Sequence, residues 1–144
     1  LAEESAKGSH IIFLCDNHAP DDAEFRMFPP HCIRGSEETE VIPELREFVG
    51  EVIPKARFSC FYGTNLDTIL GALGTETILV GGISTQRSVE GTARDAKNRD
   101  LQCIVVSDCC TAGELDVHEM TIKHVLPLLV RVRTTDEVVA ALRP

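Results

Sequence analysis

The feature that most constrains the fold is the alternation of short apolar runs with amphipathic segments along the whole chain. The apolar runs are typical of buried strands, and the segments between them carry apolar residues at helical spacing. We expect strands over 10–15, 52–58, 77–80, 103–106 and 129–132, and helices over 43–49, 65–73, 86–99 and 116–126, with a last helix beginning at Thr134 and a helix tail over 1–7. Strands and helices that alternate with short links predict an α/β fold, in which helices cover both faces of a parallel sheet in a three-layer, Rossmann-like α/β/α arrangement.

The helix over 86–99 should bury its small residues Val89, Ala93 and Ala96. The pairs Asp116 with Glu119 and Thr134 with Glu137 are spaced to cap the starts of the last two helices. The apolar face expected on the last helix consists of Val138, Val139, Ala141 and Leu142.

Length and composition fit one globular domain over residues 1–144. The net charge of −9 argues against nucleic acid and against an anionic membrane surface as partners. No apolar run reaches the about 20 residues that span a bilayer, and the start of the chain does not read as a signal peptide. The six cysteines lack zinc-ribbon spacing, and Cys15 and Cys103 lie in predicted buried strands, where a reduced thiol behaves as a small apolar group. We therefore expect a reducing, cytoplasmic compartment. A redox switch at Cys109 and Cys110 is the alternative.

Three residues near the start are spaced as metal ligands. Asp16 and His18 follow the first apolar run, and His31 closes a proline-rich stretch in the long connection 17–42. One carboxylate and two imidazoles bind a divalent transition metal and leave positions open for water or substrate. Sites in open α/β sheets are built at the carboxyl ends of strands, which is where Asp16 falls. The alternative is two unrelated loop histidines and an aspartate that begins a turn.

A second candidate site follows the strand over 77–80. Gly81 and Gly82 lead into a helix start that carries Ser84, Thr85 and Ser88. Free backbone N–H groups and the helix dipole favour an anion at such a place, and the Ser88 hydroxyl is positioned to face it. In the alternative reading the three hydroxyls only cap a helix.

Four stretches together resemble the cysteine hydrolases of the isochorismatase superfamily, and within it the nicotinamidases. Residues 15–20, Cys-Asp-Asn-His-Ala-Pro, are similar to the nicotinamidase Asp-Trp-His-Pro, and residues 28–33, Phe-Pro-Pro-His-Cys-Ile, to its Trp-Pro-Pro-His-Cys-Val. Residues 54–66 resemble the segment of the catalytic lysine, and residues 82–96 that of the nucleophile. The matches occur in the family's order and cover essentially all of the chain.

The resemblance implies an amidase reaction and assigns a role to each matched residue. In this family a cysteine thiolate attacks an amide carbonyl, ammonia leaves, and water hydrolyses the thioester. The implied site comprises metal ligands at Asp16, His18 and His31, a stacking wall at Phe28 with Tyr62 also binding substrate, a proton-handling Lys55, a nucleophile position at Ser88, and an oxyanion hole from the backbone N–H groups of Ser84 and Ser88. The family also places a cis peptide before that hole, which here joins Ile83 to Ser84.

Two departures from the family bear on activity. The nucleophile position holds Ser88, whose hydroxyl is far less acidic than a thiol and needs a committed base. This serine is either an engineered replacement or the mark of a natural branch without the thiol. The family's catalytic aspartate lies on a strand that precedes the helix ending here at Lys7, so it has no counterpart in this chain. We therefore expect an N-terminally incomplete domain that lacks its first strand. If the chain were the whole protein, we would expect it to be unstable or to borrow a strand from a partner.

These residues predict metal-assisted hydrolysis of a small amide, with nicotinamide as the first substrate to test. The expected cofactor is a divalent metal, with zinc as the first choice and iron or manganese as alternatives. A homo-oligomer is expected by resemblance alone. One alternative is a relative that binds ligand without catalysis, which Ser88 favours. Another is a vinyl-ether hydrolase of the isochorismatase type, against which the metal set counts.

Overall fold

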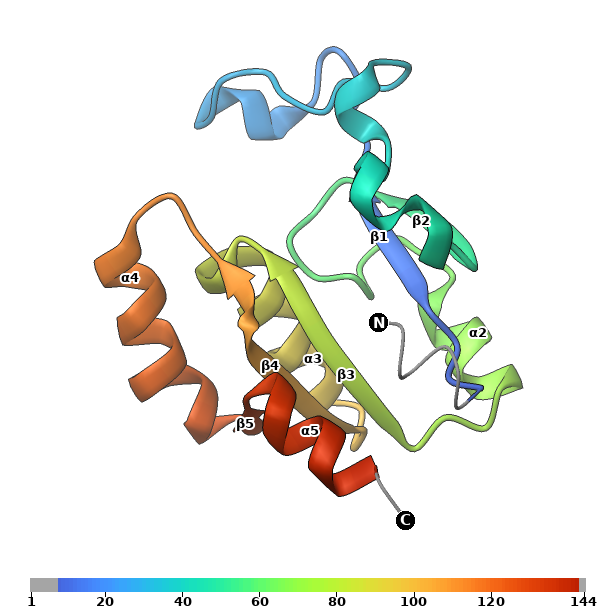
Figure 1. The fold of residues 1–144 in the computed structure, drawn as a ribbon. Helices are drawn as coiled ribbons and strands as arrows, with labels where there is room; N and C mark the ends of the chain where they lie inside the picture. Colours follow the sequence, from blue (N-terminus) through green and yellow to red (C-terminus); the bar gives the residue numbers. More distant parts are fainter. Residues whose placement is uncertain (1–7, 143–144) are drawn as a thin grey trace. The chain divides into compact units, whose positions relative to one another are not determined.

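The computed structural model describes residues 8–142, so the helix tail expected over 1–7 lies outside the described residues. Contacts group the chain into two compact units (Figure 1). The first unit holds the described residues up to Arg57 together with Gly63–Asn65, and the second holds Phe58–Tyr62 and the residues from Leu66 onward.

The five described strands pair only in parallel, which confirms the α/β fold expected from the alternation. In the first unit β1 (Ile12–Asp16) pairs with β2 (Glu51–Lys55), and the register sets Asp16 opposite Lys55. In the second unit β3 (Thr77–Ile83), β4 (Gln102–Thr111) and β5 (Arg131–Arg133) form a sheet in that order. The second strand ends at Lys55, earlier than expected, since its partner β1 ends at the residue opposite.

The long connection between β1 and β2 is folded into short 3-10 turns. These turns span Ala23–Arg26, Glu37–Thr39 and Pro43–Phe48. The last turn matches the short helix expected there, with Pro43 in its first position, where the missing N–H of proline costs nothing.

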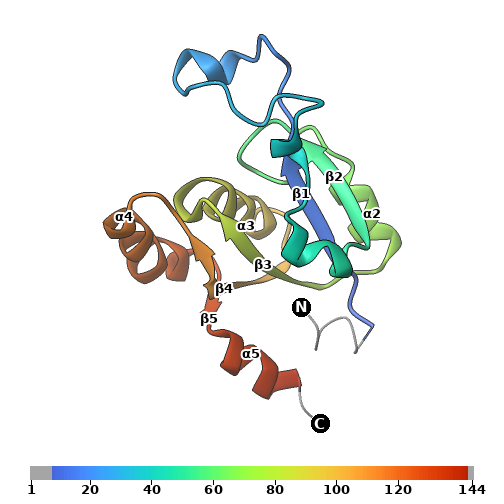
Figure 2. The ribbon, with the colours of Figure 1, turned by 45° about the horizontal axis from the view of Figure 1, so that its top comes forward.

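In the second unit, helices α3 (Glu90–Lys97) and α5 (Thr135–Leu142) lie on opposite sides of the sheet (Figures 1 and 2). The expected buried face of α3 is confirmed, because Val89, Ala93 and Ala96 are at most 2% exposed. Small alanines let this helix approach the strands closely. Helices α2 (Leu66–Ala72) and α4 (Leu115–Met120) are shorter than the amphipathic patterns predict.

Of the two predicted helix caps, the one at Thr134 is present and the one at Asp116 is not. At α5, the Thr134 hydroxyl accepts from the N–H of Glu137 at 3.3 Å, and the Glu137 carboxylate accepts from the N–H of Thr134 at 2.8 Å. The apolar face expected on α5 is only half-buried at Val138 and Val139 and exposed at Leu142.

The capping start expected at Asp116 is wrong. Helix α4 begins one residue earlier, after Glu114, whose side chain makes no capping bond. The segment then continues as a π-helical turn over Thr121–Val125 and a 3-10 turn over Leu126–Leu128. Pro127 supplies no N–H to a regular helix at this point, which is consistent with the change of winding.

The glycine pair that was expected to end the third strand instead lies inside it. Gly82 has a φ of +138°, and a Cβ on Gly81 would lie 3.0 Å from the Cβ of Cys109. The pairing partner on β4 jumps from Val105 to Cys110 across this point. The glycines therefore allow a bulge that carries β4 on to Thr111.

None of the helices between residues 8 and 142 has both the length and the apolar character needed to cross a membrane.

Candidate active site and metal cluster

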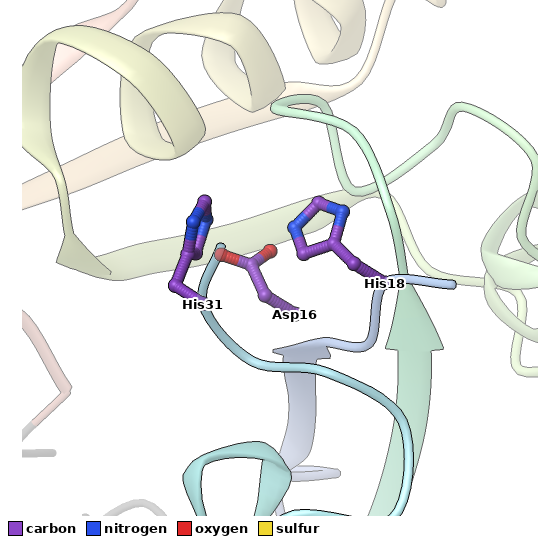
Figure 3. A group of neighbouring side chains, drawn as sticks. All are labelled: Asp16, His18 and His31. Atoms are coloured by element: carbon purple, nitrogen blue, oxygen red, sulfur yellow. The ribbon is translucent and has the colours of Figure 1, made fainter. Parts of the chain in front are cut away.

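The three predicted metal ligands converge in the first unit. One ligand atom each of Asp16, His18 and His31 lies within 4.8 Å of the others. Figure 3 shows the Asp16 carboxylate between the two imidazole rings. The alternative, in which these residues are unrelated loop groups, is therefore wrong.

Backbone pairing brings the two histidines together. Asp16 is the last residue of β1, and two residues later the N–H of His18 donates to the carbonyl of Cys32 at 2.9 Å. The N–H of Arg34 donates back to the carbonyl of His18 at 2.9 Å. This short parallel bridge sets His31 beside His18, and their ring centroids are 4.9 Å apart.

The nitrogen atoms of both rings are arranged to suit a cation. In His31, Nδ1 donates to the carbonyl of Pro29 at 2.8 Å, since a carbonyl can only accept. His18 is 1% exposed and its Nδ1 lies 3.2 Å from an oxygen of Asp22. Its Nε2 is buried and has no hydrogen-bond partner among the described residues. A buried nitrogen without a partner beside a carboxylate and a second imidazole fits a divalent metal.

His18 also contacts an ion pair, which Asp22 forms with Arg57. The Asp22 oxygens accept from Nη1 of Arg57 at 3.0 and 3.1 Å, and the N–H of Glu24 donates to one of them at 2.9 Å. The hydrogen bond from the N–H of Glu24 lowers the pKa of Asp22 most, and burial opposes it. With the further hydrogen bonds of Arg57 and His18, this pKa falls to about 2. The sequence reading missed Asp22 and Arg57, because 35 residues separate them.

Lys55 is buried and contacts Asp16, one of the three candidate metal ligands. Its Nζ is ion-paired with Oδ1 of Asp16 and donates to the carbonyl of Arg57 at 3.1 Å. Lys55 is 5% exposed, so this charge is largely withdrawn from water. The β1–β2 register that sets Asp16 opposite Lys55 thus positions both charges.

An aromatic ring that was not predicted from the sequence, Phe25, lies near both histidines. Phe25 lies 5.5 Å from His18 and 5.7 Å from His31 between ring centroids. Phe28, which the resemblance assigns to substrate stacking, is half-buried in the same loop. Its role as a stacking wall stays a prediction.

The turn over Thr85–Val89, which carries the predicted nucleophile position Ser88 and is called the nucleophile turn below, belongs to the second unit. The peptide bond between Ile83 and Ser84 is cis, as the resemblance predicted. The turn over Thr85–Val89 is π-helical, and the carbonyl of Ser84 accepts from the N–H groups of Arg87 and Val89 at 3.1 and 3.3 Å. The Ser84 side chain makes no capping bond, so the capping alternative fails for this residue.

A buried hydroxyl ties this turn to β4 and α4. Thr85 is fully buried, and its Oγ1 donates to the carbonyl of Thr111 at 3.0 Å. Because that bond uses the hydroxyl proton, Oγ1 accepts from Nδ1 of His118 at 2.7 Å. Nearby, Nε2 of Gln86 lies 3.4 Å from the carboxylate of Glu114. His118 was missed because only the fold brings it to Thr85.

Four of the six cysteines are unsuited to replace the missing thiol nucleophile. Burial raises the pKa of Cys103 and Cys110 to about 11. Burial, together with the charge of Asp16, also raises the pKa of Cys15 and Cys32. An activated cysteine has a lowered pKa instead.

The segment after Lys55 is held on helix α3. The N–H of Cys60 donates to the hydroxyl of Thr92 at 3.0 Å, and Gly91 lies against Phe58, where a Cβ would be 3.5 Å from the Phe58 Cβ. Tyr62, which the resemblance assigns to substrate, is 68% exposed at the end of this segment.

The predicted site residues fall into two groups. The first unit brings Asp16, His18, His31 and Lys55 together, and Phe28 lies in the same unit. Ser84, Ser88 and Tyr62 lie in the second unit. The catalytic, oxyanion-hole and substrate-binding roles of these residues stay predictions.

Comparison with known proteins identifies the family. The family model described as the isochorismatase domain matches residues 1–137. The chain therefore belongs to the isochorismatase family.

Solved structures of similar fold include several hydrolases. An isochorismatase-like hydrolase from Alkaliphilus metalliredigens is 29% identical with a TM-score of 0.90, covering 99% of this chain and 81% of that one. The N-carbamoylsarcosine amidase of Thermoplasma acidophilum is 34% identical with a TM-score of 0.83, covering 94% and 78%. The pyrazinamidase/nicotinamidase of Streptococcus mutans is 26% identical with a TM-score of 0.83, covering 91% and 79%.

In sequence, the chain is similar to the uncharacterized isochorismatase family protein YecD of Escherichia coli O157:H7. The two are 38% identical over 90 residues, which is 62% of this chain and 48% of YecD. The chain thus spans about half the length of this curated relative.

Proposed function

We propose that this protein is a metal-assisted amidohydrolase of the nicotinamidase type, which converts nicotinamide to nicotinate and ammonia. The observation that carries the proposal is the convergence of Asp16, His18 and His31 beside the buried Lys55. Two of the similar structures, named as an N-carbamoylsarcosine amidase and a pyrazinamidase/nicotinamidase, support hydrolysis of a C–N bond.

The residues of the chain divide the chemistry between them. A divalent metal, when bound, supplies positive charge and coordination positions for a ring nitrogen and for water. Lys55 contributes a second positive charge that favours developing negative charge on the carbonyl oxygen. Ser88 occupies the position from which the family's nucleophile attacks the carbonyl carbon, and the N–H groups of Ser84 and Ser88 are the proposed donors to the resulting oxyanion.

Ser88 favours one further candidate, a relative that binds the amide without turning it over. A serine retains much of the shape of a cysteine, so binding can outlast catalysis. The metal cluster and Lys55 remain assembled in this case as well.

Ammonia release by the full-length protein tests the proposal. We expect release from nicotinamide in the presence of zinc and its loss after chelation, with slower release from an N-carbamoyl amino acid. Faster release from the carbamoyl substrate would change the substrate class. Binding of nicotinamide with no release would favour the non-catalytic candidate. By resemblance alone we also propose a homo-oligomer, which size-exclusion chromatography with light scattering tests.

A further inference from the structure

The carboxylate of Asp22 is enclosed by groups that all donate to it. Its side chain is 7% exposed. Oδ1 accepts from the N–H of Glu24 at 2.9 Å, Arg57 donates to both oxygens at 3.0 and 3.1 Å, and Nδ1 of His18 lies 3.2 Å from Oδ2. An ionised carboxylate has no proton to offer, so Nδ1 of His18 must be the donor in the last contact.

This contact decides which nitrogen of His18 is free. A neutral imidazole carries one proton, and placing it on Nδ1 leaves the lone pair on Nε2. That Nε2 atom is the one buried without a partner among the described residues. We propose that Asp22, held by Arg57, is a positioning residue that fixes the tautomer and orientation of His18 for a divalent metal. The inference rests on the metal site of the proposed function and goes beyond its three ligands.

Arg57 gives the arrangement its second anchor. Lys55 and Arg57 lie two residues apart, and each pairs with a different acid. Lys55 pairs with Asp16 at the end of β1, and Arg57 pairs with Asp22 in the loop that follows. One short segment therefore fixes both a metal ligand and the carboxylate behind another ligand. His31 needs no such carboxylate, since the carbonyl of Pro29 already fixes its Nδ1 proton.

Asp22→Asn is the sharpest test because every neighbour of the carboxylate is a donor. An amide has one oxygen, so its NH₂ group must face one of those donors. With the oxygen kept on the N–H of Glu24, the NH₂ group faces His18 Nδ1 and favours the tautomer with its proton on Nε2, which blocks the metal lone pair. We expect zinc affinity to fall about 10- to 100-fold. Asp21→Asn is the matched control, because it removes the same charge from an exposed neighbouring position.

Asp22 also caps the turn over Ala23–Arg26, so a purely structural role must be separated. Asparagine caps as well as aspartate does, whereas alanine does not. If capping alone matters, Asp22→Asn binds zinc like the unchanged protein and only Asp22→Ala loses affinity. If Asp22 positions His18, both variants lose affinity. Calorimetric titration with Zn²⁺ measures this, and Mn²⁺ serves as a second probe because thiolates do not favour it.

Imidazole ¹⁵N NMR of the metal-free protein gives a readout that does not depend on metal or activity. We expect the His18 proton on Nδ1 in the unchanged protein and in Asp21→Asn, and on Nε2 in Asp22→Asn. Unchanged affinity and tautomer in Asp22→Asn would overturn the inference and leave the metal site intact. Failure of the unchanged protein to bind either metal would overturn the metal site itself, and with it the inference.

Discussion

Two regions of the molecule are held in place by different kinds of contact. One is the metal loop, which runs from Asp16 at the end of β1 to His31, and the other is the nucleophile turn over Thr85–Val89. In the metal loop, charges position the ligands, with Asp16 paired to Lys55 and Asp22 paired to Arg57. In the nucleophile turn, a buried hydroxyl, Thr85, links a backbone carbonyl to the His118 ring. We therefore expect the loop to be sensitive to charge and to bound ligand, and the turn to be sensitive to the loss of its buried hydrogen bonds. Changes in the loop should alter binding, and changes under the turn should alter stability.

The largest expected effect is on the rate of the reaction and comes from replacing the side chain of Ser88 in the nucleophile turn. Ser88→Cys should raise the rate of ammonia release from nicotinamide by orders of magnitude, because a thiol ionises far more readily than a hydroxyl. Ser88→Ala is the control, since alanine carries neither a hydroxyl nor a thiol, and it should show no gain. Steady-state kinetics of the full-length protein measure the change. Equal rates for the cysteine and alanine variants would favour a relative that has lost catalysis.

The next largest effect is expected for a metal ligand itself, compared with a residue such as Asp22 that only contacts a ligand. His18→Ala should weaken zinc binding by more than the about 10- to 100-fold expected for an outer-shell residue, since it removes a ligand outright. His124→Ala is the matched control, because His124 is exposed and distant in sequence from the cluster. Calorimetric titration compares the two. If both variants bind zinc equally well, His18 is not a ligand.

A smaller effect tests whether the turn depends on its buried hydroxyl. Thr85→Val keeps the shape of the side chain but leaves the carbonyl of Thr111 and Nδ1 of His118 without their partner. We expect a loss of about 1–3 kcal/mol in the free energy of unfolding, measured in urea. Thr85→Ser, which keeps the hydroxyl, should lose less. A valine variant as stable as the unchanged protein would contradict the role given to this contact.

The smallest effect is expected at a position outside both regions. It shows whether a general loss of stability by itself changes zinc affinity. Thr134→Ala removes the exposed capping box at the start of α5. The expected loss is about 1 kcal/mol in the free energy of unfolding, with no change in zinc affinity. A change in zinc affinity would show that the loop responds to general destabilisation, which would weaken the contrast between the two regions.

Sequence patterns predicted the features that depend on neighbouring residues. The metal set was readable because Asp16 and His18 are two apart at a strand end and His31 follows a short motif. The buried face of α3 was readable from its helical spacing. The length of β4 was not, because its extension to Thr111 depends on a bulge opposite Gly81 and Gly82.

Features built from distant residues escaped the sequence reading. Asp22 meets Arg57, and Thr85 meets His118, across more than 30 residues in each case. Neither pair forms a motif, and only the fold brings the partners together. The cis peptide before Ser84 came from resemblance alone and is present in the structure.

The central claim is that one carboxylate and two imidazoles bind one metal ion. X-ray data collected at the metal absorption edge from crystals grown with zinc test it most directly. An anomalous peak about 2.0–2.2 Å from Asp16, His18 and His31 is the expected result. A peak at the cysteine sulfurs, or none at this loop, would contradict the claim.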